Sequence, residues 1–481
     1  MTLIIKGANS LINPMSPPRE NIDMMLNSPK KAIIRMFLMV SVTFIVIKVN
    51  GFLDIYWIAN LSTEAISAVS IVTPIYSIVA ALGLGVGTGA CVCIAYRLGK
   101  HDYRVANVMA STAIYLGLVV SIPAILFLLF GTELMFYNVD EEGVRGLTRE
   151  YVIPLACGAP ILILTGIVTN FLKAEGAMRA MVVCSLISIP VNAILTPVFV
   201  YVCEWGIKGA STATVLGSLV SMILMLYLLH SDKHHIKLKL VRPTFSNVKE
   251  VLGVGLPKAL EEFLGGLTIL VQNIILISKL GGDAVAIHGL TFSLMYLFTI
   301  LSDSMSAATQ PVCSTAAGAH RIESMRSSMI FSTLILIGLS LLVVLFLELF
   351  TPEVVQFING GDAGELEEEM ILAVGMYALM LPFYLLSRLA STLLQVLRKA
   401  HVWAPIFLVL SNIQVALLYF FATDIESMLI IVAISTSLLG IVGYALCHHY
   451  AVTYDPDAVE RMIDNGEGVP RLEKLGGNKT A

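Results

Sequence analysis

Charged residues are scarce in this chain. Asp, Glu, Lys and Arg together make up 13% of its 481 residues, whereas a soluble protein carries about 25%. The mean hydropathy is +0.84, and the formal net charge of −4 provides no basic surface for nucleic acid. The composition therefore excludes an ordinary soluble domain, indicates a chain that lies in a lipid bilayer, and predicts no nucleic-acid partner.

Motifs that carry chemistry are also lacking. The seven cysteines are scattered through apolar runs and show neither a disulfide framework nor zinc-site spacing. The glycine-rich run GLGVGTGA, residues 83–90, lies inside an apolar segment, which favours close helix packing over dinucleotide binding. We find no nucleophile motif and no ATP-binding loop, so we expect no enzyme activity and no cofactor. The mixed first thirty residues, with Pro14, Pro17 and Pro18, predict no cleavable signal peptide.

Long apolar runs are what the sequence has in abundance. A helix needs about 20 apolar residues to cross a bilayer, and twelve such runs are present. Runs of this length form helices rather than barrel strands, because the backbone polar groups must be satisfied within each segment. We therefore predict an all-α integral membrane protein with twelve transmembrane helices. The runs cover approximately residues 33–59, 64–96, 105–131, 149–171, 179–202, 208–229, 250–278, 284–315, 328–350, 369–396, 401–422 and 426–450.

The distribution of Lys and Arg predicts the orientation of the chain. When both chain ends are placed on one side, the segments on that side hold 23 of these residues and the opposite loops hold four. Positive charge gathers on the cytoplasmic side of membrane proteins. We therefore expect a multi-pass protein of the plasma membrane with both termini in the cytoplasm.

The two halves of the chain resemble each other. STAIYLGL (111–118) resembles STLILIGL (332–339), and LDIYWIANLSTEA (53–65) can be aligned with QNIILISKLGGDA (272–284). This parallel repeat predicts two six-helix lobes related by a pseudo-two-fold axis along the membrane normal, an arrangement common in transporters. The predicted parts are an N-terminal tail (1–32), an N-lobe (33–230), an inter-lobe loop (231–249), a C-lobe (250–451) and a C-terminal tail (452–481).

Seven ionisable residues lie within the predicted spans, and each is a candidate for function because charge in hydrocarbon is costly. They are Lys48, Asp54, Lys258, Glu261, Glu262, Asp303 and Arg388. Asp54 is the strongest candidate, because its counterpart in the repeat is Asn273 and a packing role would not require an acid in one copy. Lys48 lies about 120° around the helix from Asp54, so we expect no direct ion pair between them.

The candidate cavity charges are Lys48, Glu261, Glu262, Asp303 and Arg388. Lys258 and Glu262 have the i,i+4 spacing of a helical ion pair, and Asp303 could pair with Arg388 across two helices. The alternative for Lys258, Glu261 and Glu262 is a charged turn at the membrane interface, at the inner start of the seventh span.

Several stretches together resemble the MATE (multidrug and toxic compound extrusion) family, nearer its DinF-like prokaryotic branch. The resemblance covers roughly residues 25–450 and implies a secondary antiporter. Such a protein exports amphipathic, often cationic small molecules against an inward flow of Na⁺ or H⁺. The stretches are LDIYWIANLSTEAISAVS (53–70), GTGACVCIAYRLGKHD (87–102), FLKAEG (171–176), VNAILTPVFVYVCEWGIKGASTATVLG (191–217), GVGLPKALE (253–261) and AATQPV (307–312).

The resemblance also implies a cation or proton site in the N-lobe. Motif alignment assigns it to Asp54, Asn192, Thr214 and Tyr151, with Na⁺ possible at the first three. Thr196 stands where the family has a second acid. One carboxylate with Thr and Asn oxygens can still ligate Na⁺, although with less charge, so the coupling ion is Na⁺ or H⁺.

Two further positions depart from the family pattern. Met39 stands about where the family has a kinking proline, which leaves bending of the first span open. Lys48 is a base that the pattern does not include, and we hypothesise that it acts as a tethered cation in place of part of a bound ion.

Other functions stay open at this point. The first alternative is a flippase for a lipid-linked precursor, which a cavity lined with cations would favour. A membrane-embedded enzyme is the second, and would need a constellation of catalytic groups at one depth. For the antiporter we expect a small-molecule substrate, a surrounding lipid bilayer and a monomeric state.

Overall fold

The computed structural model describes residues 18–135, 142–231, 234–238, 241–358 and 366–465. Every regular element within these residues is a helix, and twelve of the helices are long and apolar enough to cross a membrane. The predicted all-α membrane fold is thereby confirmed. Residues 1–17 and 466–481 of the predicted tails lie outside the described residues.

Each predicted span corresponds to one long helix. The N-lobe contains α3 (Pro29–Ala59), α4 (Thr63–Gly99), α5 (Tyr103–Met135), α6 (Glu142–Ala174), α7 (Met178–Pro197) with its π-helical continuation η1 (Val198–Val202), and α8 (Gly206–His230). The C-lobe contains α9 (Phe245–Leu280), α10 (Gly282–Gly318), α11 (Ile322–Leu349), α13 (Glu367–Val396), α14 (Ala400–Phe421) and α15 (Ile425–Val452). The described residues also form three short helices: α2 (Pro18–Asn27), α12 (Thr351–Ile358) and α16 (Pro456–Asp464).

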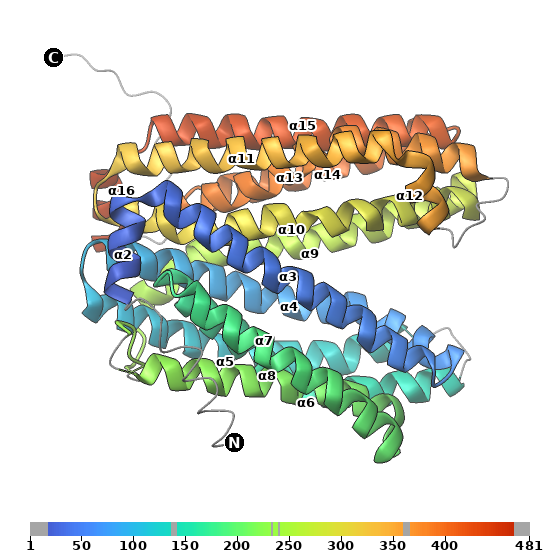
Figure 1. Cartoon of the computed structure of the whole chain (residues 1–481), viewed down its shortest axis with the longest axis horizontal. Coiled ribbons are helices and arrows are strands. Elements are labelled where there is room, and N and C mark those ends of the chain that lie inside the picture. Colours follow the sequence, from blue (N-terminus) through green and yellow to red (C-terminus); the bar gives the residue numbers. More distant parts are fainter. Residues whose placement is uncertain (1–17, 136–141, 232–233, 239–240, 359–365, 466–481) are drawn as a thin grey trace.

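The packing of the helices repeats from one lobe to the other. In the N-lobe α4 packs on α5 and α6, α6 packs on α8, and α7 packs on α3 and α8. In the C-lobe α10 packs on α11 and α13, α13 packs on α15, and α14 packs on α9 and α15. Figure 1 shows the N-lobe (blue to green) beside the C-lobe (yellow to red). The same contacts in the same order support the predicted two-lobe repeat.

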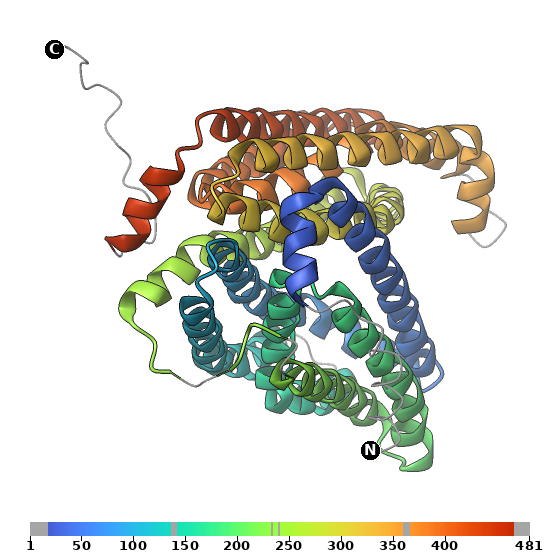
Figure 2. The same ribbon diagram turned by 60° about the vertical axis from the view of Figure 1, so that its left-hand side comes forward.

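The first helix of each lobe also packs on the opposite lobe. Helix α3 contacts α10 as well as α7, and its counterpart α9 contacts α4 as well as α14. Figure 2 shows α3 running obliquely beside both lobes. Helix α3 is therefore packed between its own lobe and the other lobe.

Both described tail helices lie at one end of the bundle, which we call the terminal end (Figure 1). Arg321 anchors α2 there by donating to the Leu26 carbonyl at 2.9 Å. Lys100 donates to Glu460 and so anchors α16, and this hydrogen bond lowers the pKa of the Glu460 carboxyl. Twelve spans put the two tails on the same side, as expected for an even number.

At the terminal end the backbones of the two lobes touch through a symmetric pair of glycines. A Cβ added to Gly99 of α4 would overlap the carbonyl oxygen of Thr315 in α10, and one added to Gly318 of α10 would overlap the carbonyl oxygen of Tyr96 in α4. Gly99 and Gly318 end corresponding helices. Only a residue without a side chain lets these two backbones touch.

We predict that Gly318→Ala weakens closure of the terminal end, because the added methyl group meets backbone that cannot rotate away. Overpacking of this kind costs about 1–3 kcal/mol. The melting temperature of the purified protein in detergent should fall by several degrees. Gly338→Ala is the matched control, since nothing lies within 4 Å of its added Cβ. Equal melting temperatures for the two variants would contradict the proposed close contact.

Candidate functional site

Asp54 lies in the last turns of α3, five residues before the helix ends at Ala59. This part of α3 is far from the terminal end of the bundle. The side chain of Asp54 is half-buried. Asn50, one helical turn earlier, donates from Nδ2 to Asp54 Oδ2 at 3.3 Å. The sequence reasoning did not include Asn50 in the site, although its i,i+4 spacing and its polar character in an apolar run were available signals.

Helix α7 supplies the next two members of the site. Thr196 is fully buried and donates from Oγ1 to Asp54 Oδ1 at 3.4 Å, while the same hydroxyl lies 3.0 Å from the Asn192 carbonyl oxygen. The Asn192 amide contacts Asn50 Nδ2 at 2.9 Å. When the side-chain amide of Asn192 is rotated so that its oxygen and nitrogen exchange places, the nitrogen donates to Asp54 Oδ1 at 3.1 Å. Thr196 therefore occupies the position beside Asp54 that the family pattern gives to a second acid.

Helix α8 brings Thr214 to the far side of Asn192. Thr214 Oγ1 lies 3.5 Å from Asn192 Nδ2. Gly217 lets the two helices approach, because a Cβ there would lie 3.1 Å from the Asn192 Cβ, and Ser188 fixes them by donating to the Gly217 carbonyl at 2.7 Å. The predicted Asp54, Asn192, Thr196 and Thr214 are thus brought together.

Tyr151 lies near this group without joining its hydrogen bonds. Its ring packs on the small apolar cluster that includes Ile58 of α3 and Ile207 of α8. No hydrogen bond links Tyr151 to Asp54 within the described residues. Tyr151 therefore lies beside the site without a hydrogen bond to Asp54. Its role as a site residue stays a prediction.

The side chains around Asp54 are of the kinds that can hold a small hard cation or a proton. We call Asn50, Asp54, Asn192, Thr196 and Thr214 the Asp54 site. All five side chains offer oxygen, the ligand atom that Na⁺ prefers. In the described part of the chain no Lys or Arg nitrogen lies within 4.0 Å of the Asp54 carboxylate, so its negative charge is available to an incoming cation.

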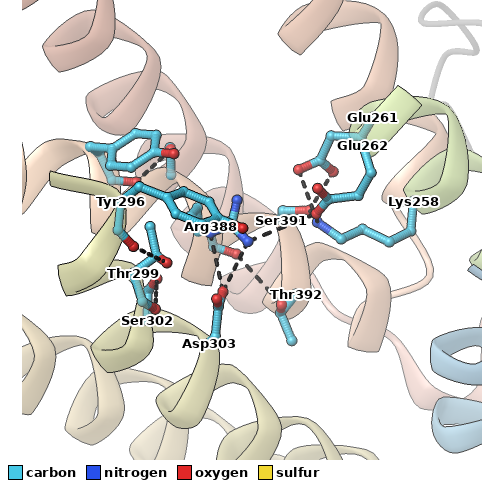
Figure 3. Close-up of polar contacts among 12 residues, drawn as sticks. Lys258, Glu261, Glu262, Tyr296, Thr299, Ser302, Asp303, Arg388, Ser391 and Thr392 are labelled. Atoms are coloured by element: carbon cyan, nitrogen blue, oxygen red, sulfur yellow. Dashed lines mark hydrogen bonds and ion pairs between the residues drawn. The ribbon is translucent and has the colours of Figure 1, made fainter. Parts of the chain in front are cut away.

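The C-lobe holds a second polar group, the C-lobe charge cluster, formed by Lys258, Glu261, Glu262, Asp303 and Arg388 (Figure 3). Arg388 donates from Nε and Nη2 to Asp303 Oδ1 at 3.1 and 2.9 Å. Lys258 Nζ lies 3.1 Å from Glu261 Oε1 and 2.9 Å from Glu262 Oε1. Both predicted ion pairs, Lys258 with Glu262 and Asp303 with Arg388, are present.

Lys258 and its neighbours are helical and do not form a turn, whereas their position relative to the membrane interface stays a prediction. These residues lie well inside α9, which begins at Phe245, and Lys258 and Glu261 are 8% and 9% exposed. Ser391 of α13 donates to Glu261 Oε2 at 2.5 Å. Helix α9 begins five residues before the predicted apolar run, so these charges lie within the helix and contact α13.

Lys48 points away from Asp54. Its ammonium lies 3.7 Å from the centroid of the Tyr296 ring on α10. No carboxylate oxygen lies within 4.0 Å of it in the described ranges. The expectation that Lys48 and Asp54 form no direct ion pair holds, and the lysine contacts the C-lobe.

Buried polar contacts join the lobes near the terminal end. Glu250 of α9 accepts from Arg97 of α4 through Oε2 and from Arg398 through Oε1, both at 3.0 Å. All three residues are less than 9% exposed. Lys173 of α6 donates to Gln310 of α10 at 2.6 Å. The predicted spans end at residues 96 and 396, so this contact was not predicted: Arg97 lies in the last turn of α4, and Arg398 lies in the loop after α13.

Two lobes of six membrane-crossing helices, with an isolated acid inside one of them, have the architecture of secondary transporters. The comparison with known families agrees. The chain belongs to the MatE family, whose model matches residues 40–198 and 268–420. This membership confirms the resemblance seen in the sequence, and the expectation that the chain is not an enzyme.

Two multidrug export proteins are similar to about half of the chain. The multidrug export protein MepA of Staphylococcus saprophyticus is 32% identical over 251 residues, which cover 51% of this chain and 55% of that protein. MepA of Staphylococcus aureus strain NCTC 8325 is 29% identical over a match with the same coverage. The chain thus spans about half the length of the curated relatives it matches.

Solved structures share the fold over nearly the whole chain. A multidrug resistance MATE family transporter in an outward-facing conformation has a TM-score of 0.84 at 23% identity, covering 90% of this chain and 98% of its own. A MOP superfamily transporter from Pyrococcus furiosus, described as having a binding pocket of reverse polarity, has the same TM-score and coverage at 22% identity. A MATE protein in a bent conformation has a TM-score of 0.83 at 22% identity, covering 92% of this chain and 99% of its own.

We predict that Glu250→Gln opens the terminal end, because it leaves two buried arginines without a counter-charge. Breaking a buried ion pair costs about 3–5 kcal/mol. Spin labels at the exposed positions 104 and 323, one in each lobe, should show a new population at longer distance in pulsed EPR. Glu426→Gln, at an exposed helix start, is the control. An unchanged distance distribution in Glu250→Gln would exclude a closing role for this contact.

Proposed function

We propose that this protein is a secondary antiporter that exports amphipathic, cationic small molecules in exchange for inward Na⁺ or H⁺. The observation that carries the proposal is the Asp54 site, an acid held within a membrane helix by neutral oxygen and amide groups. Family membership and the name of the matched relatives, multidrug export protein, support the export of small molecules. The Lys and Arg distribution supports cytoplasmic termini.

Alternating access follows from where the contacts lie. The lobes are joined at the terminal end by Glu250 with its two arginines and by the crossing at Gly99 and Gly318. Asp54 lies toward the other end, so an ion from that side reaches it first. With the termini in the cytoplasm, the structure corresponds to a state closed to the cytoplasm.

Loading of the Asp54 site is the step that favours one conformation over the other. A proton or Na⁺ removes the net negative charge that Asn50 and Thr196 now stabilise through hydrogen bonds. The packing of α3 on α7 then changes, and α3 also packs on α10 of the opposite lobe. A ligand shifts a conformational equilibrium only through its different affinity for the two states, and this contact supplies that difference.

The flippase alternative is less well supported. It was favoured by a cavity lined with the cations Lys48, Lys258 and Arg388. Of these, Lys258 and Arg388 are each paired with carboxylates, and Lys48 lies over the Tyr296 ring. A network with three acids and two bases offers no excess positive charge to a phosphorylated lipid precursor. A monomeric state remains part of the proposal.

We predict that Asp54→Asn abolishes ion-driven export while the protein stays folded. The amide has the same shape and can keep its hydrogen-bond partners, but it carries no charge that can bind or release an ion. Dye efflux from proteoliposomes with an imposed Na⁺ or H⁺ gradient should fall at least tenfold. Asp283→Asn, an acid in the first turn of α10, is the control and should keep wild-type rates. Wild-type efflux by Asp54→Asn would remove Asp54 from the mechanism.

We also predict that Thr196→Asp strengthens the dependence of transport on Na⁺. The new carboxylate would stand next to Asp54, since the present hydroxyl is 3.4 Å from it, and two carboxylates attract a cation more strongly than one. The Na⁺ concentration for half-maximal efflux should fall several-fold. Thr196→Asn provides a neutral control of nearly the same size as Asp. If the Thr196→Asp and Thr196→Asn variants show the same dependence of efflux on Na⁺ concentration, the charge at position 196 does not set the affinity for the ion.

A further inference from the structure

Lys48 is placed on an aromatic surface of the opposite lobe. It projects from α3 of the N-lobe, and its ammonium lies 3.7 Å from the centroid of the Tyr296 ring in the C-lobe. That distance is well inside the range of a cation–π contact, about 6 Å. Within the described residues the Lys48 ammonium forms no ion pair and contacts the Tyr296 ring instead.

The surroundings of Tyr296 are those of a site for an organic cation. Asp303 follows seven residues later on α10, two helical turns along the same face. Arg388 pairs with Asp303 and lies 3.9 Å from Glu262, yet the side chains of these two acids are still 33% and 26% exposed. An exposed aromatic ring, 49% accessible in Tyr296, beside carboxylates that are not fully enclosed is the chemistry that recognises quaternary and primary ammonium groups.

We propose that the Tyr296 ring, with the neighbouring acids, is the binding site for the ammonium group of the transported cation, and that Lys48 occupies this site as a tethered competitor when no substrate is bound. The proposal rests on the proposed export of cations and names the residues that would select among them. A tethered group acts at an effective concentration in the millimolar range, so weakly binding cations would not displace it.

Displacement of Lys48 would also have a conformational consequence. The contact between Lys48 and Tyr296 joins the two lobes directly, because the residues lie on α3 and α10. A substrate that takes the ring removes this link. Substrate binding would therefore favour separation of α3 from α10, as required for a change of state.

Binding measurements on the full-length protein in nanodiscs test the proposal. Tetrabutylammonium is titrated into wild type, Lys48→Met and Lys48→Arg by calorimetry without any ion gradient. Removal of the competitor should tighten binding by about two- to thirtyfold, the range that corresponds to a cation–π contact. Lys48→Arg should bind as wild type does, because Arg also stacks on aromatic rings. Unchanged or weaker binding by Lys48→Met would overturn the proposal.

A double variant separates competition at the ring from simple removal of a positive charge. Tyr296→Leu should weaken binding of tetrabutylammonium, and Lys48→Met should then bring little further gain. If Lys48→Met tightens binding equally with and without Tyr296, the lysine acts through long-range charge and the proposal is wrong. Lys48→Gln serves as a second variant if Lys48→Met does not fold.

The same measurements distinguish this proposal from the proposed function. Tighter binding in Lys48→Met that depends on Tyr296 supports the ring site even if wild type shows no ion-driven efflux, which would overturn the antiporter instead. Ion-driven efflux of cations by wild type, with no effect of Lys48→Met on binding, overturns only the ring site.

Discussion

The hydrogen-bonded carboxylate of Asp54 is the interaction on which the account depends. A charge within hydrocarbon is costly, and the structure meets this cost with Asn50 from the same helix and Thr196 from α7. The charge and the packing of α3 on α7 are therefore linked, because any change in the charge changes the hydrogen bonds that hold the helices. Since α3 also packs on α10, the proposed change of charge at Asp54 would act on a helix that contacts both lobes.

The repeat explains how so local a change could move whole lobes. Helices α3 and α9 are counterparts, and each packs on both lobes. The backbones of the two lobes touch at Gly99 and Gly318. The lobes are also joined by the ion pairs of Glu250 with Arg97 and Arg398. The symmetry is not complete: the Asp54 position holds Asn273 in the C-lobe, and the C-lobe has a charge cluster of its own. The fold is shared by the halves, whereas the chemistry differs.

Much of this could be predicted from the sequence, for physical reasons that also explain the failures. Apolar length alone located the twelve helices, because a bilayer imposes a minimum span. Asp54 was found as an acid within a predicted span whose repeat counterpart is Asn273, Thr196 was found by motif alignment, and the pairing of Asp303 with Arg388 was predicted from charge. The contact of Arg97 with a residue of the other lobe was not predicted, because a charge near a span end resembles an interfacial residue until the partner helix is known.

The most direct test of the central claim is the simultaneous measurement of substrate and ion fluxes in proteoliposomes. Efflux of a cationic dye is followed together with the movement of ²²Na⁺ and of protons. The account predicts that addition of substrate drives one of these ions in the opposite direction, and that removing the gradient of that ion stops net export. Export at an undiminished rate with no counterflow of either ion would contradict it.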